Sequence, residues 1–207
     1  MEVYIILTDT GTLFTKMIKK FTKQPLNHAS ISFTKDLDTT YSFGRKNEMN
    51  PFNGGFVKEN MKGKLFECAT CAIYKCTVSE FQYKQMQKNV QQMENQQQNY
   101  KYNFIGLFGV LFNKNMNRKN AFFCSEFVAT VLKKGGISIN NKPASLVKPG
   151  DFADCKDFRL VYEGSLSTYL SHYCQDSKTN ISLENKNNSY LHHIDPIYLQ
   201  MKELYAW

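Results

Sequence analysis

Two short β-type runs near the N-terminus constrain the fold of this chain more than any other feature. The runs cover His28–Phe33 and Thr39–Phe43, and the polar turn Thr34–Asp38 separates them. Two runs joined by so short a polar turn predict a β-hairpin, in which neighbouring strands are antiparallel. Any fold proposed for the chain must therefore contain an antiparallel pair at this place.

Hydrophobic periodicity and turn signals predict the remaining elements. Strands are expected at about residues 3–8, 67–78 and 159–163, and helices between the turn at 9–11 and Pro25, from Ser79 to Tyr100, and from Cys124 to Lys134. Residues 43–59 contain the breakers Asn50-Pro51 and Gly54-Gly55. This stretch is expected to form a loop packed by its own aromatic side chains. The mixture predicts an α+β fold.

Size and composition suggest one domain with a polar extension. A chain of 207 residues with 42% hydrophobic residues can bury one substantial core. We expect a folded domain over residues 1–174 and a C-terminal extension over 175–207, where Asn, Ser and Lys accumulate.

The charge balance argues against a nucleic-acid partner. The formal net charge is +8, but the sequence has only three arginines, Arg45, Arg118 and Arg159. Nucleic-acid-binding surfaces usually use the planar arginine fork, so no nucleic-acid partner is expected.

The N-terminus and the most apolar segment predict neither export nor membrane insertion. MEVYIILTDTGTLF has an acid at position 2, a short apolar run and no small-residue cleavage site. FIGLFGVLF, residues 104–112, is far shorter than the roughly 20 residues that cross a bilayer. We therefore expect a cytoplasmic protein without a transmembrane segment, and residues 104–112 either pack in the core or contact lipid.

Three of the six cysteines form the cluster CATCAIYKC at Cys68, Cys71 and Cys76. Half of a zinc site has this spacing, but no second C-x2-C or H-x3-H follows at a suitable distance. The alternation of the segment instead favours a strand with buried, reduced cysteines. No metal and no other cofactor is expected.

Cys124 is the cysteine best placed for catalysis. It opens the predicted helix in FFCSEFVATVLKKGG, where unpaired backbone N–H groups and the helix dipole favour the thiolate. Of the four histidines, His28 is expected on a rigid strand, with the small Ser30 and Ser32 on the same face. From these residues alone, Cys124 and His28 form either a nucleophile and its base or a buried thiol and a structural histidine.

The order of the segments resembles the circularly permuted members of the NlpC-type papain-like cysteine peptidase and amidase superfamily. More distantly, it resembles lecithin retinol acyltransferase-like enzymes. The similar segments are LNHASISF, YSFGRKNEMNPFNGGFVKE and FFCSEFVATVLKKGG, and the resemblance covers about residues 3–165. In this permuted group the histidine precedes the cysteine, as it does here.

The resemblance implies a small antiparallel sheet or half-barrel that carries His28 as general base, packed on the helix that starts with the nucleophile Cys124. It also implies a third polar group on the strand after the histidine strand. The hairpin brings residues 42–44 beside His28, so Ser42 is the candidate. Glu126 is an alternative, although its position on the helix should point it away from the thiol.

The function implied is a cysteine hydrolase of the amidase or peptidase type, acting through a thioester on a peptide-, amide- or acyl-containing substrate. Asn27, Tyr41 and Arg45 are candidates for lining the cleft. Two alternatives are a lipid acyltransferase or thioesterase, with residues 104–112 supplying an apolar channel, and a non-catalytic binding module on the same fold.

Overall fold

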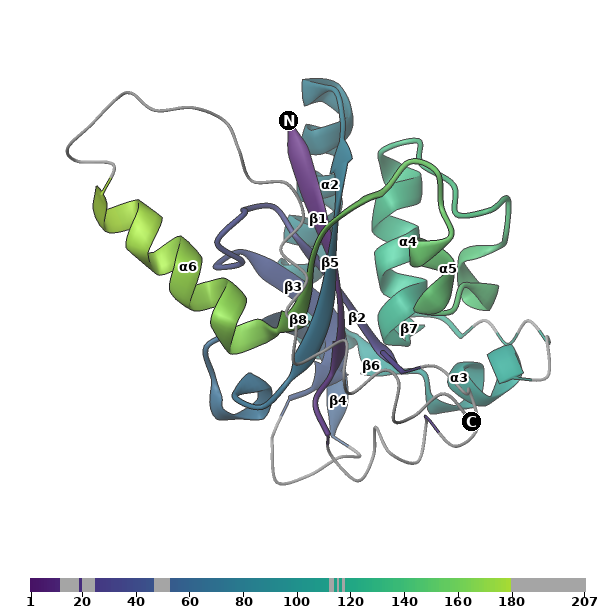
Figure 1. Cartoon of the computed structure of the whole chain (residues 1–207). Helices are drawn as coiled ribbons and strands as arrows, with labels where there is room; N and C mark the ends of the chain where they lie inside the picture. Colours follow the sequence, from purple (N-terminus) through teal and green to yellow (C-terminus); the bar gives the residue numbers. More distant parts are fainter. Residues whose placement is uncertain are drawn as a thin grey trace.

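The computed structural model describes residues 1–11, 19, 25–46, 53–111, 114, 116 and 118–179. These residues form a mixed α+β fold around one sheet in which all neighbouring strands are antiparallel (Figure 1). The strand order is β4-β3-β2-β1-β5-β8. Its strands are β1 (Glu2–Asp9), β2 (His28–Ser32), β3 (Thr40–Arg45), β4 (Gly54–Glu59), β5 (Thr70–Thr77) and β8 (Arg159–Ser165). A separate small parallel pair joins β6 (Lys101–Tyr102) to β7 (Ala121–Phe122).

The central strand β1 explains why the sheet has a core on each face. Alternate side chains of β1 point to opposite faces, and Ile5 and Ile6 are both fully buried. Ile5 belongs to the larger core, whereas Ile6 belongs to the smaller one on the other side. A run as apolar as VYIILT therefore fits a strand that is covered on both faces.

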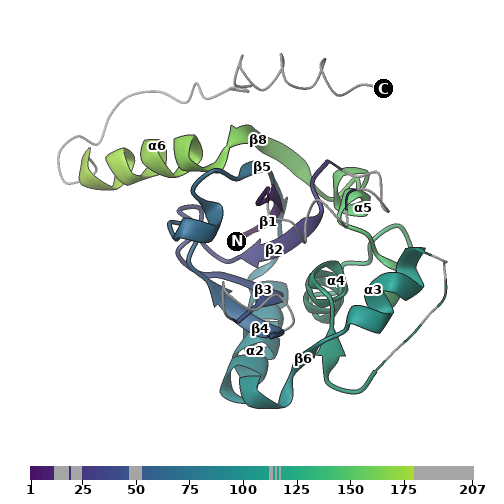
Figure 2. The ribbon, with the colours of Figure 1, turned by 90° about the horizontal axis from the view of Figure 1, so that it is seen from below.

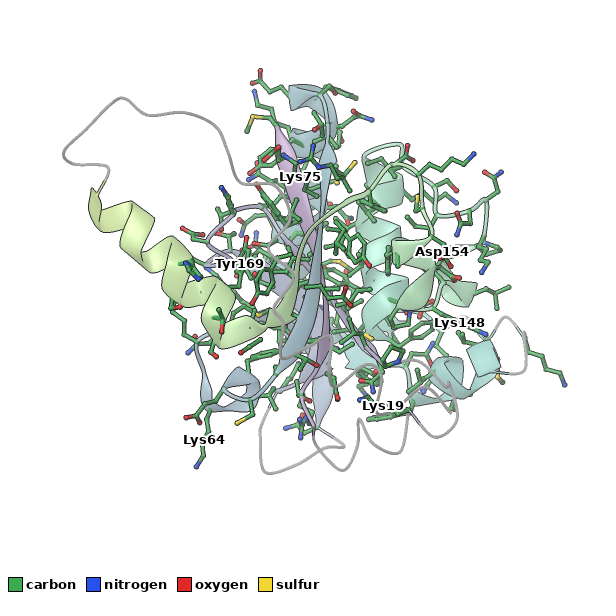
Figure 3. The ribbon with its side chains drawn as sticks, viewed as in Figure 1. Lys19, Lys64, Lys75, Lys148, Asp154 and Tyr169 are labelled. Carbon is green, nitrogen blue, oxygen red and sulfur yellow. The ribbon has the colours of Figure 1, made fainter. Side chains whose placement is uncertain are left out.

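Helices cover the two faces unequally (Figure 1). The longer elements are α2 (Glu80–Asn95), α3 (Phe104–Leu111), α4 (Cys124–Lys134), α5 (Gly150–Ala153) and α6 (Leu166–Thr179), and the 3-10 turns are η1 (Lys64–Phe66), η2 (Gln97–Asn99) and η3 (Ala144–Leu146). The larger core takes side chains from α2, α4 and α5. The smaller core takes them from η1 and α6, and Figure 3 shows Tyr169 of α6 between that helix and the sheet.

Several sequence predictions are confirmed. The hairpin forms between β2 and β3, with Ile31 paired to Tyr41. The predicted helix at Cys124–Lys134 is α4, without a change at either end. The predicted strand at 159–163 is β8, and the predicted strand at 3–8 is β1.

Other predictions need correction. The stretch 43–59 was expected to be a loop, but its last residues form β4, an edge strand of the sheet. The cysteine strand β5 starts at Thr70, so Cys68 lies before it and is exposed. The helix α6 was not predicted, and it runs from Leu166 to Thr179. The helix expected between 11 and Pro25 lies outside the described residues, apart from Lys19.

None of the helices in the described part of the chain has the length and apolar character needed to cross a bilayer.

Candidate active site

Cys124 is the first residue of α4 and is almost fully buried, with 3% of its surface exposed. Its sulfur lies against the start of β2. The pairing of β2 with β3 is at the other end of β2, where Ile31 pairs with Tyr41 and Ser32 with Thr40. Backbone N–H groups of Ala29 and Ser125 donate hydrogen bonds to the thiolate. The thiol therefore sits where the sheet and the helix N-terminus both present donors to it.

His28 connects the thiol to an acid. It is the first residue of β2 and lies opposite Thr8 of β1. Its imidazole makes a hydrogen bond with the Cys124 side chain, and Nε2 of the ring lies 2.8 Å from Oε1 of Glu59. The side chains of His28 and Glu59 are only 16% and 6% exposed, so water screens this pair weakly.

The protonation of this pair favours an ionised thiol. Burial alone would lower the pKa of His28, but the charge of Glu59 and the hydrogen bond to Cys124 outweigh it and raise the pKa to about 10. Burial alone would raise the pKa of Cys124, but the hydrogen bond and charge of His28 outweigh it, and the pKa is lowered. The arrangement therefore favours a thiolate beside an imidazolium at neutral pH.

Glu59, the last residue of β4, holds three side chains at once. Besides His28, its Oε2 accepts the hydroxyl of Ser30 at 2.5 Å and its Oε1 accepts the hydroxyl of Ser42 at 2.7 Å. Burial would raise the pKa of Glu59, but the charge of His28 and these hydrogen bonds keep the pKa below its ordinary value. A carboxylate fixed in this way can orient the histidine ring and stabilise its charged form.

Tyr102 of β6 closes the other side of the thiol. The pairing of Tyr102 with Phe122 of β7 brings β6 to the residues that directly precede α4. The Tyr102 hydroxyl makes a hydrogen bond with the Cys124 side chain and accepts another from the Cys124 backbone N–H. Burial and the nearby Cys124 charge raise the pKa of Tyr102 well above its ordinary value, so the phenol keeps its proton and remains a donor.

A buried acid supports the start of α4. Oε2 of Glu126 accepts the backbone N–H of Phe123 at 3.3 Å, and the carboxylate also makes a hydrogen bond with the Asn103 side chain. Burial raises the pKa of Glu126 to about 7 despite these two bonds. Glu126 therefore caps the helix beneath the thiol and does not orient His28.

A cavity of about 320 Å³ opens beside these residues. Its lining includes Cys124, His28 and Tyr102 together with the apolar side chains of Val57, Leu65, Phe66, Phe43 and Phe104. Lysine and arginine side chains border it, and Glu59 is the acid among the lining residues. The cavity is large enough for a small organic group next to the sulfur.

The structure separates the residues predicted from the sequence into two sets. His28 and Cys124 meet, and Asn27 and Arg45 line the cavity. Tyr41 instead packs in the larger core, where its hydroxyl points to Glu94 at 3.5 Å, and it is not among the lining residues.

The third polar group also differs from the prediction. Among the hydrogen bonds of the described residues, the acid bonded to His28 is Glu59, and Ser42 reaches His28 only through Glu59. Ser42 is fully buried and its short side chain ends at the carboxylate. Sequence reasoning missed Glu59 and Tyr102. The β-type residues Phe56 and Val57 could have suggested β4, and the two-residue period of a strand would place Glu59 on the face of Val57.

No metal site competes with this interpretation in the part of the chain that the structure describes. No group of three potential metal-ligating side chains occurs there. Cys71 and Cys76 are buried on β5 without disulfide partners, and burial raises their pKa values. Their thiols are therefore protonated and unreactive at neutral pH.

No protein-family model matches the chain, and no curated protein matches it.

Proposed function

We propose that the chain is a cysteine hydrolase of the amidase or peptidase type, with Cys124 as nucleophile, His28 as general acid and base, and Glu59 as the group that orients His28. The observation that carries the proposal is the continuous series of hydrogen bonds from Cys124 through His28 to Glu59. Structural cysteines are buried among apolar groups that raise the thiol pKa, whereas the surroundings of Cys124 lower it.

The fold proposed is the permuted papain-like one. The antiparallel sheet, the position of His28 at the start of a strand and the position of Cys124 at the start of a helix support it. The order of the two residues, with His28 before Cys124, is the order of the permuted group.

The reaction proposed is acyl transfer to water. The Cys124 thiolate attacks the substrate carbonyl carbon, and the carbonyl π electrons move to oxygen, where the Cys124 N–H and the Tyr102 hydroxyl can donate hydrogen bonds. The His28 imidazolium gives its proton to the leaving nitrogen or oxygen as that bond breaks. Neutral His28 then removes a proton from water, whose oxygen attacks the thioester, and the carboxylic acid leaves as the thiolate and imidazolium are restored.

A mild thiol electrophile tests the proposal. The full chain is treated with iodoacetamide across pH 5–9, and adducts are located by peptide mass spectrometry. Cys124 should react well below the pH at which an ordinary thiol ionises, and His28→Ala should slow its reaction at pH 6 by about tenfold or more, because the thiolate loses its charged partner.

Cys68 provides an internal control because it is exposed and is not among the residues that line the cavity. Its rate should not change in His28→Ala. Equal rates at Cys68 and Cys124 at pH 6, or a Cys124 rate that does not depend on His28, would show that the proposed pair does not form a nucleophile.

The apolar part of the cavity favours a second candidate within the same chemistry. Leu65, Phe66 and Phe104 line it, and Phe104 opens the apolar helix α3. A substrate with an acyl chain, cleaved or transferred through the same thioester, would fill such a lining. Comparison of short-chain and long-chain p-nitrophenyl esters separates the candidates, since a rate that rises with chain length favours the acyl substrate.

A further inference from the structure

The helix α3 exposes apolar side chains at the surface. Its eight residues include no charged one, yet Ile105 is 48% exposed. Met116 returns over the same helix: a side-chain carbon added at Gly109 would lie 2.9 Å from Met116 Cγ, and Asn103 Nδ2 donates to the Met116 carbonyl at 3.2 Å. Met116 is itself 43% exposed. Two large apolar side chains are thus held at the surface by contacts with one short helix.

Basic residues lie close to these two side chains in the sequence, on both sides of Met116. No acidic residue occurs between Glu94 and Glu126, whereas this part of the sequence contains four basic residues. They are Lys101, Lys114, Arg118 and Lys119, and all four are exposed. None of the ion pairs found among the described residues involves them. We call the surface made of Ile105, Met116, Lys114, Arg118 and Lys119 the α3 surface.

The α3 surface and the cavity share the first turn of one helix. Phe104 lines the cavity beside Cys124, and the next residue, Ile105, is exposed on the same helix. Figure 2 shows α3 at the periphery of the molecule, beside α4 and away from the sheet.

We infer that the α3 surface docks on a lipid bilayer that contains anionic phospholipid. Exposed apolar side chains with exposed lysine and arginine close by in the chain fit a surface that enters the headgroup region, where the apolar groups leave water and the cations meet lipid phosphates. A second copy of this chain fits less well, because two such basic surfaces would repel each other. The inference goes beyond the proposed hydrolase, since binding does not need the reaction.

Vesicle binding tests the inference in the full chain carrying Cys124→Ala, so that no reaction intervenes. Sedimentation is measured with phosphatidylcholine vesicles and with vesicles that also contain phosphatidylglycerol. The protein should favour the anionic vesicles by about tenfold or more at low salt, and the preference should fall as salt screens it. Ile105→Ser with Met116→Ser should weaken binding to both kinds of vesicle by about tenfold or more, because two apolar anchors are lost.

Charge reversal and a matched control complete the test. Lys114→Glu with Lys119→Glu should remove the preference for anionic vesicles. Phe81→Ser with Lys88→Glu makes the same kinds of change at two exposed positions of α2 and should leave binding unchanged. Circular dichroism of each variant shows whether it is folded.

Two results would overturn the inference: equal binding to neutral and anionic vesicles at low salt, or a loss in the α2 control as large as in the α3 variants. A dimer in light scattering that Ile105→Ser with Met116→Ser dissociates, together with no vesicle binding, would assign the surface to self-association instead. Since the Cys124→Ala chain is used, none of these results depends on whether the proposed hydrolase is correct.

Discussion

Glu59 is the residue that joins the strands of the candidate site. It belongs to β4, yet its carboxylate crosses β3 to reach His28 and Ser30 on β2. The crossing is possible because the β3 residues on its path are small, with Ser42 donating a hydrogen bond and Gly44 leaving space. A search restricted to the strand next to His28 stops at Ser42, which is why the sequence predicted the wrong partner for the ring.

Replacement of Glu59 should separate its role from that of Ser42. In Glu59→Gln, we expect kcat/KM for an activated amide or ester to fall by about a hundredfold, because the histidine loses the charge that orients it and stabilises its imidazolium. Ser42→Ala should cost no more than about fivefold, since it removes one of three hydrogen bonds to the carboxylate. Steady-state kinetics checks both, and a larger loss in Ser42→Ala than in Glu59→Gln would contradict the assignment.

At the scale of elements, the close approach of β4 to β6 positions Tyr102. A side-chain carbon added at Gly54 would lie 2.8 Å from Cβ of Tyr102, and one added at Gly55 would lie 2.7 Å from the carbonyl oxygen of Tyr100. Both glycines therefore allow the β6 segment to pack directly on a strand. In the sequence the pair looked like a turn signal, so the packing role of the glycines concealed β4.

A variant at Gly54 should disturb Tyr102 without touching Cys124. We expect Gly54→Ala to lower kcat by about tenfold, because the added methyl group displaces the Tyr102 ring and its hydroxyl from the thiol. Tyr102→Phe should lower kcat to a similar degree. The double variant checks the cause: if both changes remove the same hydrogen bond, Gly54→Ala should have little further effect in the Tyr102→Phe background. Fully additive losses would mean that Gly54 acts elsewhere.

The elements that the sequence predicted well are those whose ends carry their own signals. The helix α4 ends before Gly135 and Gly136, and its apolar stripe has helical spacing. The helix α6 was missed although Leu166, Tyr169 and Leu170 have the i, i+3, i+4 spacing of a buried helical face. The polar residues that continue this helix looked like part of a tail in the sequence.

At the scale of the whole molecule, the ionised Glu59 links the site to the stability of the fold in acid. The pKa of Glu59 is below its ordinary value in the folded protein, so the unfolded chain binds the proton more readily. Its contribution to stability is therefore fully present above about pH 4.5, the pKa of an unperturbed glutamate, and is lost as the pH falls through the lower pKa of the folded state.

Urea unfolding at several pH values checks this linkage. Between pH 7 and pH 3, the free energy of unfolding of the unmodified chain should fall by about 1–2 kcal/mol more than that of Glu59→Gln, which has no carboxylate to protonate. Glu67→Gln, a change at an exposed position, should retain the original pH dependence. If the free energy of unfolding of Glu59→Gln depended on pH as strongly as that of the unmodified chain, the Glu59 carboxyl would be no more acidic in the folded state than in the unfolded chain.

The four side chains of the candidate site come from distant parts of the chain, with His28 on β2, Glu59 on β4, Tyr102 on β6 and Cys124 on α4. Closing such long segments is the slow, entropically costly part of folding, and helices and hairpins form sooner. A chain in which α4 is already helical but has not reached β2 lacks the imidazolium beside its cysteine. The lowered pKa of the Cys124 thiol therefore depends on long-range contacts and is absent until the sheet and helix have joined.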